Sequence, residues 1–140
     1  MAARRWACDT SVAIAALDPN HKDHDACRRR VVETRPALAG HAAFETYAVL
    51  TRLPPPLRLT GVQAADVLSR AFPDECWLEA HALGPMLHRL AAARVAGGAV
   101  YDGLVGEAAR TTGRSLLTRD RRAERTYRSL DVEYEFVESS

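Results

Sequence analysis

The sequence is poor in cysteine, and its three cysteines are widely separated. Cys8, Cys27 and Cys76 form no C-x-x-C pair. An odd, dispersed set of this kind argues against a disulfide framework and against a zinc ribbon, because both need paired thiols. We therefore expect the three cysteines to be small buried hydrophobic residues of a protein from a reducing compartment.

Long apolar runs are also absent. No stretch approaches the roughly 20 apolar residues that cross a bilayer. Asp9 follows Arg4 and Arg5 too closely to leave room for the apolar segment of a signal peptide. Repeats and low-complexity tracts are missing as well, and 140 residues suit one core. These absences predict a cytoplasmic protein with a single domain over residues 1–140.

Lysine is almost missing, since Lys22 is the one lysine among 19 basic residues. Arginine suits bidentate phosphate binding, but a codon bias would produce the same composition, and both interpretations stay open. The formal net charge of +1 gives no overall field that would attract nucleic acid. Composition therefore selects no partner by itself.

Short apolar runs alternate with helical patterns along the chain. Buried strands are predicted at 6–8, 37–39, 76–78 and 115–118, and the alternation at 132–136 predicts a half-buried edge strand. Helices are predicted at 10–17 with a Thr10 or Ser11 cap, 21–33, 41–53, 60–72 with a capping box, 83–96, 101–112 and 121–130. This order predicts an α/β fold, in which a parallel sheet is covered by helices on both faces.

Four acidic residues occupy positions where solvated acids are not expected. Asp9 ends the first predicted strand, and Asp120 follows the strand at 115–118. Ligands of open parallel sheets bind beyond the carboxyl ends of the strands, so both residues lie where a ligand site is expected in such a fold. Glu45 interrupts an otherwise apolar helix face, and Asp102 begins a helix beside small residues.

Each of these acids, taken alone, is also explained as a helix cap or an ion-pair partner, and Asp102 in particular suits a helix N-terminus. Four together are harder to explain in that way, because clustered buried carboxylates need a compensating cation. Oxygen ligands favour Mg²⁺ or Mn²⁺ over zinc. Such an ion activates water for attack on a phosphodiester, so we expect a metal-dependent nuclease.

The motifs that contain these acids resemble those of a known family. Cys-Asp-Thr-Ser-Val at 8–12, Phe-Glu at 44–45, Tyr-Asp at 101–102 and Leu-Leu-Thr-Arg-Asp at 116–120 occur in order and with suitable spacing. The set resembles the PIN-domain ribonucleases, and most closely the VapC toxins of bacterial toxin–antitoxin pairs. The resemblance covers nearly the whole chain.

The resemblance implies a PIN-like three-layer sandwich and a Mg²⁺-dependent endoribonuclease, in which Mn²⁺ is able to substitute. It implies metal ligation by Asp9, Glu45, Asp102 and Asp120. Ser11 and Thr118 would orient carboxylates or waters around them. Implied partners are RNA, a VapB-like antitoxin and a second copy of the chain, with no membrane and no DNA contact by the toxin alone. RNA would be cleaved to leave a 5′-phosphate and a 3′-hydroxyl.

Several further groups have competing interpretations. Arg119, Arg121 and Arg122 flank a proposed ligand and are candidate phosphate contacts, whereas Arg28-Arg29-Arg30 is favoured as a solvated face. His21 and His24 suit a solvated face or the rim of an RNA groove better than a zinc site. His41 is expected to begin a helix. The apolar stripe on the helix at 83–91 serves either a dimer or the core.

Two other function classes are weighed against the nuclease. A non-catalytic PIN-like binding module is disfavoured because all four acids are present. A receiver-like signalling domain also clusters acids around Mg²⁺. Sequences that resemble that class have an acidic pair after the first strand and a lysine late in the chain. Here the lone lysine is Lys22, so this class is excluded.

Overall fold

The computed structural model describes residues 3–139, and its centre is one sheet of five short parallel strands. The strand order is β3-β2-β1-β4-β5. The strands are β1 (Trp6–Cys8), β2 (Ala37–Ala39), β3 (Glu75–Cys76), β4 (Ser115–Thr118) and β5 (Tyr134–Phe136). The predicted α/β class and the edge position of the last strand are both confirmed.

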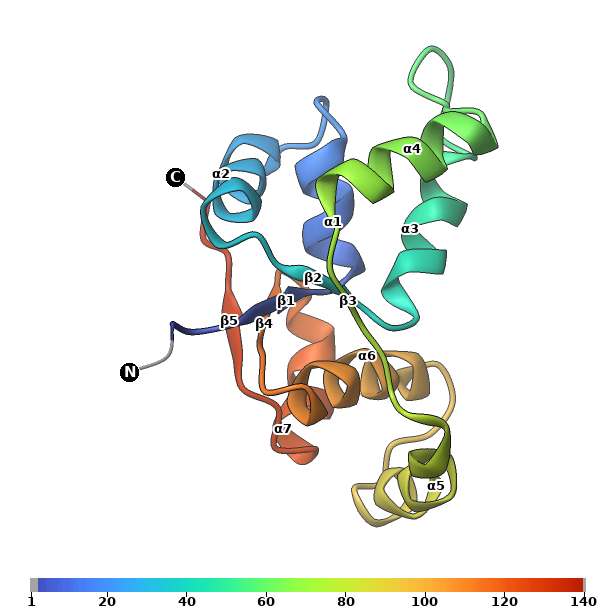
Figure 1. The fold of residues 1–140 in the computed structure, drawn as a ribbon, viewed down its shortest axis with the longest axis vertical. Coiled ribbons are helices and arrows are strands. Elements are labelled where there is room, and N and C mark those ends of the chain that lie inside the picture. The colour runs from blue at the N-terminus through green and yellow to red at the C-terminus, as the bar shows by residue number, and fades with distance from the viewer. Residues whose placement is uncertain (1–2, 140) are drawn as a thin grey trace.

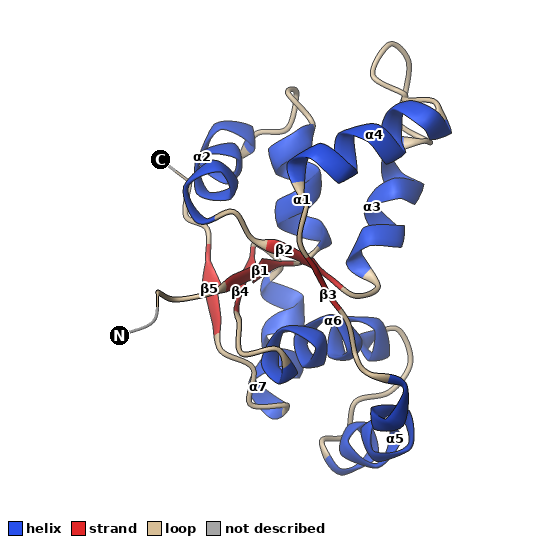
Figure 2. Ribbon diagram, in the orientation of Figure 1, coloured by secondary structure: helices blue, strands red, loops and turns tan. Residues whose placement is uncertain are grey.

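Helices cover both faces of the sheet, which gives three layers (Figure 1). On one face lie α1 (Thr10–Leu17), α2 (His24–Thr34), α3 (Ala42–Leu50) and α4 (Gly61–Ala71). The other face carries α6 (Ala99–Thr111) and α7 (Glu124–Ser129), with α5 (Leu83–Ala92) packed outside them (Figure 2). Short 3₁₀ turns at Ala80–Ala82 and Arg121–Ala123 precede α5 and α7. No helix within residues 3–139 combines the length and the apolar character that a membrane span requires.

The strand order places the switch point of the fold between β1 and β4. From β1 the chain moves outward to β2 and β3, and then crosses back to form β4 and β5 on the opposite side. Cys8 pairs with Leu117, and the Asp9 N–H continues this ladder to the Leu117 carbonyl at 3.2 Å. The carboxyl ends of β1 and β4 therefore lie side by side, which is where open α/β sheets bind their ligands.

Several helix ends differ from the predicted ones, for local reasons. The capping box of Thr60 and Gln63 is present as predicted. The helix predicted at 21–33 begins only at His24, because residues 18–23 form turns in which Asp18 accepts from the Asn20 N–H at 2.9 Å. The helix predicted to reach residue 96 ends at Ala92. Arg94 has a positive φ of 58°, and the Val95 N–H turns back to the Leu90 carbonyl, as in a Schellman motif.

The buried face of α3 is not its aromatic face. Phe44 and Tyr47 are 62% and 40% exposed, whereas Ala42, Thr46 and Leu50 face the core. The Thr46 hydroxyl donates to the Ala42 carbonyl at 2.7 Å, so this residue can be buried without an unpaired polar group. The aromatic side chains of α3 therefore lie on the outer side of the helix.

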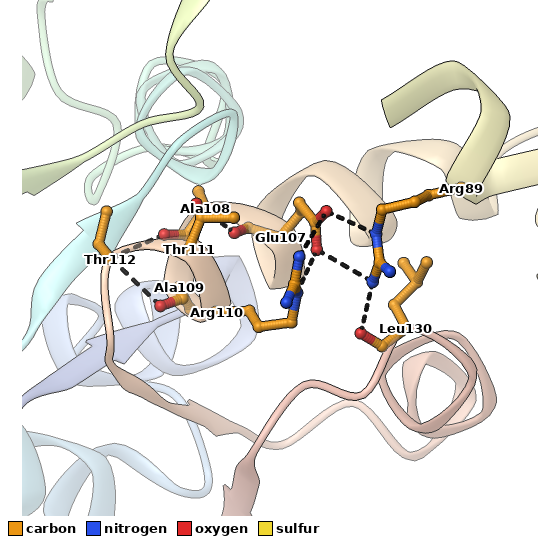
Figure 3. A network of polar contacts seen from close by, with 8 residues as sticks. All are labelled: Arg89, Glu107, Ala108, Ala109, Arg110, Thr111, Thr112 and Leu130. Atoms are coloured by element: carbon orange, nitrogen blue, oxygen red, sulfur yellow. Dashed lines mark hydrogen bonds and ion pairs between the residues drawn. The ribbon is translucent and has the colours of Figure 1, made fainter. Parts of the chain in front are cut away.

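The α5 helix divides its apolar stripe between core and solvent. Met86 and Leu90 are buried, while Leu83 and Leu87 are 58% and 69% exposed. A buried acid, Glu107, anchors the helix: its carboxylate accepts hydrogen bonds from Arg89 and Arg110 at 2.7 Å each (Figure 3). Arg89 also donates to the Leu130 carbonyl at 2.9 Å, so this group of contacts joins α5, α6 and the end of α7.

Candidate active site

The four acids singled out in the sequence line one cavity at the switch point of the sheet. This acid cavity has a volume of about 220 Å³. Asp9 follows β1, Glu45 lies on α3, Asp102 lies in the first turn of α6, and Asp120 follows β4. Thr10, Ser11 and Val105 complete its lining. The fold thus gathers side chains that are up to 111 positions apart in the sequence.

A larger hollow of about 500 Å³ lies between α3 and α4, away from these acids. Its lining is mainly apolar and includes Phe44, Tyr47, Leu68 and Trp77. The carboxylates in its described lining are the exposed sequence neighbours Asp74 and Glu75. The smaller acid cavity is the better candidate for hydrolysis, because it concentrates charged groups from four different elements.

Asp9 is the most enclosed member of the acid cavity, with 5% of its surface exposed. One carboxylate oxygen, Oδ1, accepts from the Ser11 hydroxyl at 2.6 Å and from the Val12 N–H at 3.3 Å. Asp9 is therefore the N-cap of α1, and the expectation that Thr10 or Ser11 caps this helix is wrong. Its β-region backbone and short carboxylate suit the N-cap position.

The other oxygen of Asp9, Oδ2, accepts from the hydroxyls of Thr118 and Tyr127. Burial raises the pKa of Asp9, and the four hydrogen bonds oppose that rise by favouring the charged form. The carboxylate is thus held in one orientation by donors from β4, α1 and α7.

Ser11 and Thr118 connect Asp9 to the backbone that follows β4. Each hydroxyl donates to Asp9 and accepts from this backbone: Ser11 from the Arg119 N–H at 2.8 Å, and Thr118 from the Asp120 N–H at 3.0 Å. Because both hydroxyls have defined donors and acceptors, they fix the end of β4 against the start of α1. These contacts are consistent with the orienting role that the sequence suggests for both residues.

Asp102 shows that the acids affect one another. Burial and the negative charges of Asp120, Asp9 and Glu45 raise the pKa of Asp102 from 3.8 to about 6. Arg122 acts in the opposite direction, by a smaller amount. A carboxyl group with a pKa this close to neutral is typical of functional sites, where charge is concentrated without a permanent counterion.

Glu45 and Asp120 form the outer parts of the cavity wall. Glu45 accepts from the Thr10 hydroxyl at 3.1 Å, and its other oxygen lies 3.4 Å from His41 Nε2. His41 directly precedes α3, as expected, and its ring stacks on Tyr101 with 4.9 Å between centroids. Asp120 caps the short 3₁₀ turn by accepting from the Arg122 N–H at 3.0 Å.

The three arginines around Asp120 diverge in space. Arg119 pairs with Asp23 at 2.6 Å and also donates to the Val137 carbonyl. Arg121 lies 3.8 Å above the ring of Phe136. Arg122 is 95% exposed, and its Nε lies 3.6 Å from Asp120. Among these three, Arg122 is the residue whose guanidinium stays both exposed and next to the acid cavity.

The residue that sequence reasoning missed is Tyr127. It is fully buried on α7 and donates to Asp9 Oδ2 at 2.8 Å. Gly106 of α6 makes room for it, since a Cβ there would lie 3.1 Å from the tyrosine ring. No local signal separates Tyr127 from an ordinary core tyrosine.

The donor set of the acid cavity fits Mg²⁺ or Mn²⁺, because it consists of oxygen atoms. Within residues 3–139, no three His, Cys, Asp or Glu side chains converge tightly enough to enclose an ion by themselves. The zinc alternative at His21 and His24 gains no support, because none of the described residues form such a ligand group there.

Comparison with known proteins agrees with this geometry. A family model described as the PIN domain matches residues 7–129. The chain is 44% identical over 133 residues to Ribonuclease VapC40 of Mycobacterium tuberculosis, in strains CDC 1551 / Oshkosh and ATCC 25618 / H37Rv. The matched region covers 92% of this chain and 96% of the relative. It is 43% identical over 126 residues to Ribonuclease VapC27 of the latter strain, which covers 90% of this chain and 92% of the relative.

No solved structure gives a significant match to the chain. The match to the PIN family nevertheless extends from β1 to α7, and so includes all four acids of the cavity. The relatives, at 43–44% identity over most of both chains, are named ribonucleases. The chain therefore belongs to the PIN-domain family, as a VapC-type ribonuclease toxin.

Proposed function

We propose that this chain is a Mg²⁺-dependent endoribonuclease whose metal ion is held by Asp9, Glu45, Asp102 and Asp120, with Mn²⁺ able to substitute. The observation that carries the proposal is the convergence of these four acids in one cavity, where burial and the charges of the other three raise the pKa of Asp102 to about 6. Such repulsion is relieved by a divalent cation, and the site gains affinity for that cation in return.

The four carboxylates would hold the ion partly through water molecules. A bound divalent ion supplies a water of lowered pKa and neutralises the charge that develops on a phosphate under attack. Asp9 is the residue best fixed for such a task, because its four hydrogen bonds leave it little freedom to turn. Ser11 and Thr118 act as positioning residues, since they connect Asp9 to the end of β4. The products would carry a 5′-phosphate and a 3′-hydroxyl.

The test is RNA cleavage by the purified protein, with and without chelator. Cleavage should require Mg²⁺ or Mn²⁺ and stop in excess EDTA. Asp9→Asn, Glu45→Gln and Asp102→Asn should each lower the rate by at least about a hundredfold, since each removes a charge that fixes the ion. Asp66→Asn is the matched control, because Asp66 is exposed on α4 and pairs with Arg70. Cleavage that persists in EDTA would contradict the proposal, whereas RNA binding without cleavage would favour the non-catalytic module.

We also propose that the chain acts in the cytoplasm with two protein partners, a VapB-like antitoxin and a second copy of itself. Leu83 and Leu87 support the homodimer, because they leave an exposed apolar stripe on α5. Light scattering after size exclusion should report a dimer for the wild type and a monomer for Leu87→Glu. Co-purification with the product of an adjacent reading frame would test the antitoxin. A monomeric wild type would contradict the dimer and leave the nuclease proposal intact.

A further inference from the structure

A second hollow, of about 300 Å³, adjoins the acid cavity. The two share Ser11 and Asp120 in their linings, so they meet at the junction of α1 and the end of β4. The second hollow, called the cationic cleft below, is otherwise lined by His21, Lys22, Asp23, Arg119 and Arg122. The sign of the charge therefore changes across Asp120, from carboxylates on one side to cations on the other.

Two exposed residues supply the positive charge of the cationic cleft that an external anion can reach. Arg119 is compensated by Asp23 at 2.6 Å, and the Ser139 hydroxyl also donates to Asp23. Lys22, the single lysine of the chain, is exposed and forms no ion pair among residues 3–139. Arg122 is 95% exposed, and its one ion pair among residues 3–139 is with Asp120 at 3.6 Å. Lys22 and Arg122 thus keep their charges available to an external anion.

The loop that carries Lys22 has a defined conformation. The His21 N–H donates to the Asp18 carbonyl at 3.0 Å, and the His24 N–H donates to the His21 carbonyl at 3.0 Å. His21 Nδ1 accepts from the Asp23 N–H at 3.0 Å. In the neutral ring this acceptor role leaves the proton on Nε2, so the imidazole offers a hydrogen-bond donor. The cleft therefore combines the exposed cations of Lys22 and Arg122 with an imidazole on a loop of defined conformation.

We propose that the cationic cleft binds the RNA phosphate next to the one that is cleaved, with Lys22 and Arg122 as its charge partners. This inference rests on the proposed function. An RNA strand carries one phosphate per nucleotide, so a strand with one phosphate in the acid cavity has a neighbouring phosphate close by, and the cationic cleft adjoins that cavity at Asp120. Four acids repel this polyanion, and the adjacent cations offset that repulsion. Phosphate contacts of this kind set the register of the strand without reading its bases.

The experiment measures binding of a fluorescein-labelled single-stranded RNA by anisotropy across a series of salt concentrations. The protein carries Asp102→Asn and the buffer contains Mg²⁺, so that the strand stays intact. Adding Lys22→Ala should weaken binding roughly threefold to tenfold and reduce the slope of log K against log salt by about 0.7, the value for one phosphate contact on a single strand. Arg122→Ala should have a similar effect, while Lys22→Arg should restore the slope.

Arg29→Ala is the matched control, because Arg29 is exposed on α2 and lines neither hollow. It removes the same net charge and should leave the slope unchanged. In the otherwise wild-type protein, Lys22→Ala should raise KM more than it lowers kcat, as expected for a contact made equally in substrate and transition state. An active wild type in which Lys22→Ala behaves like Arg29→Ala overturns the phosphate site alone. A wild type that cleaves no RNA overturns the proposed function instead.

Discussion

The hydroxyl of Tyr127 lies 2.8 Å from Asp9 Oδ2, and it joins the last helix of the chain to the end of the first strand. Both residues are buried, so the hydrogen bond is shielded from water. Among residues 3–139, Asp9 is the one lining residue of the acid cavity to which Tyr127 forms a hydrogen bond. It is a positioning residue, whose effect on the site passes through Asp9.

Tyr127→Phe tests this relationship, because the ring stays and the hydroxyl is removed. The variant should be less stable by about 1–3 kcal/mol in chemical denaturation, since the buried carboxylate loses a donor. Cleavage should fall more than the loss of folded protein explains. Tyr134→Phe is the control, because that hydroxyl donates to Glu124 at 2.7 Å outside the acid cavity. Equal cleavage rates for the two variants would show that Tyr127 serves packing only.

Asp102→Asn should stabilise the metal-free protein at neutral pH. The folded-state pKa of about 6 lies above the ordinary 3.8, so this group lowers stability as pH rises from about 4 to 6, and the penalty is complete above that range. For a half-buried group that solvent screens, the penalty is on the order of 1 kcal/mol.

The two proteins should therefore melt at similar temperatures near pH 3.5, and the variant should melt higher at pH 7. With millimolar Mg²⁺ the difference should shrink or reverse, because the wild type gains more from binding the ion. Thermal melts at both pH values, with and without Mg²⁺, measure this. A variant that is clearly less stable at pH 7 without metal would identify Asp102 as a structural cap.

Gly106→Ala should be destabilising despite the small size of the added methyl group. Its Cβ would lie 2.9 Å from Val132 Cγ2 and 3.1 Å from Tyr127 Cδ1, so the rings and side chains around Asp9 must move. We expect a loss of about 1–3 kcal/mol. Gly84→Ala on α5 meets nothing within 4 Å and should stabilise by about 0.5–1 kcal/mol. Chemical denaturation of both variants measures the two changes in stability, and so compares the effect of the same added methyl group in crowded and in open surroundings.

Glu107→Gln should separate stability from activity. The buried carboxylate accepts from Arg89 and Arg110, and hydrogen bonds from Arg110 and Arg89, with their charges, lower its pKa against the effect of burial. Removing its charge leaves two guanidinium groups facing each other, at a cost of about 3 kcal/mol. Cleavage per folded molecule at low temperature should stay near wild type, because Glu107 lies outside the acid cavity. A specific loss of cleavage would connect this ion pair to the site.

The alternation of short apolar runs with helical patterns was enough to predict the parallel sheet, because strands buried on both faces must be apolar along their whole length. The same reasoning predicted that Asp9 and Asp120 would meet, since the carboxyl ends of parallel strands share one edge. Helix ends were less well predicted, because the turns at 18–23 and at Arg94 depend on local hydrogen bonds that periodicity does not report.

Other features depended on the tertiary structure alone. The three arginines around Asp120 are equivalent in the sequence but have different surroundings in the structure. Arg119 pairs with Asp23, Arg121 lies over the ring of Phe136, and Arg122 is exposed to solvent. In the sequence Tyr127 resembles an ordinary core residue. Only the packing of α7 places its hydroxyl within hydrogen-bond distance of Asp9. The sequence by itself determined which residues bear charge and which elements carry them, because these follow from residue type and period. Only the packing of elements distant in sequence decided which charges are paired, which stay free, and which carboxylate a buried hydroxyl holds in place.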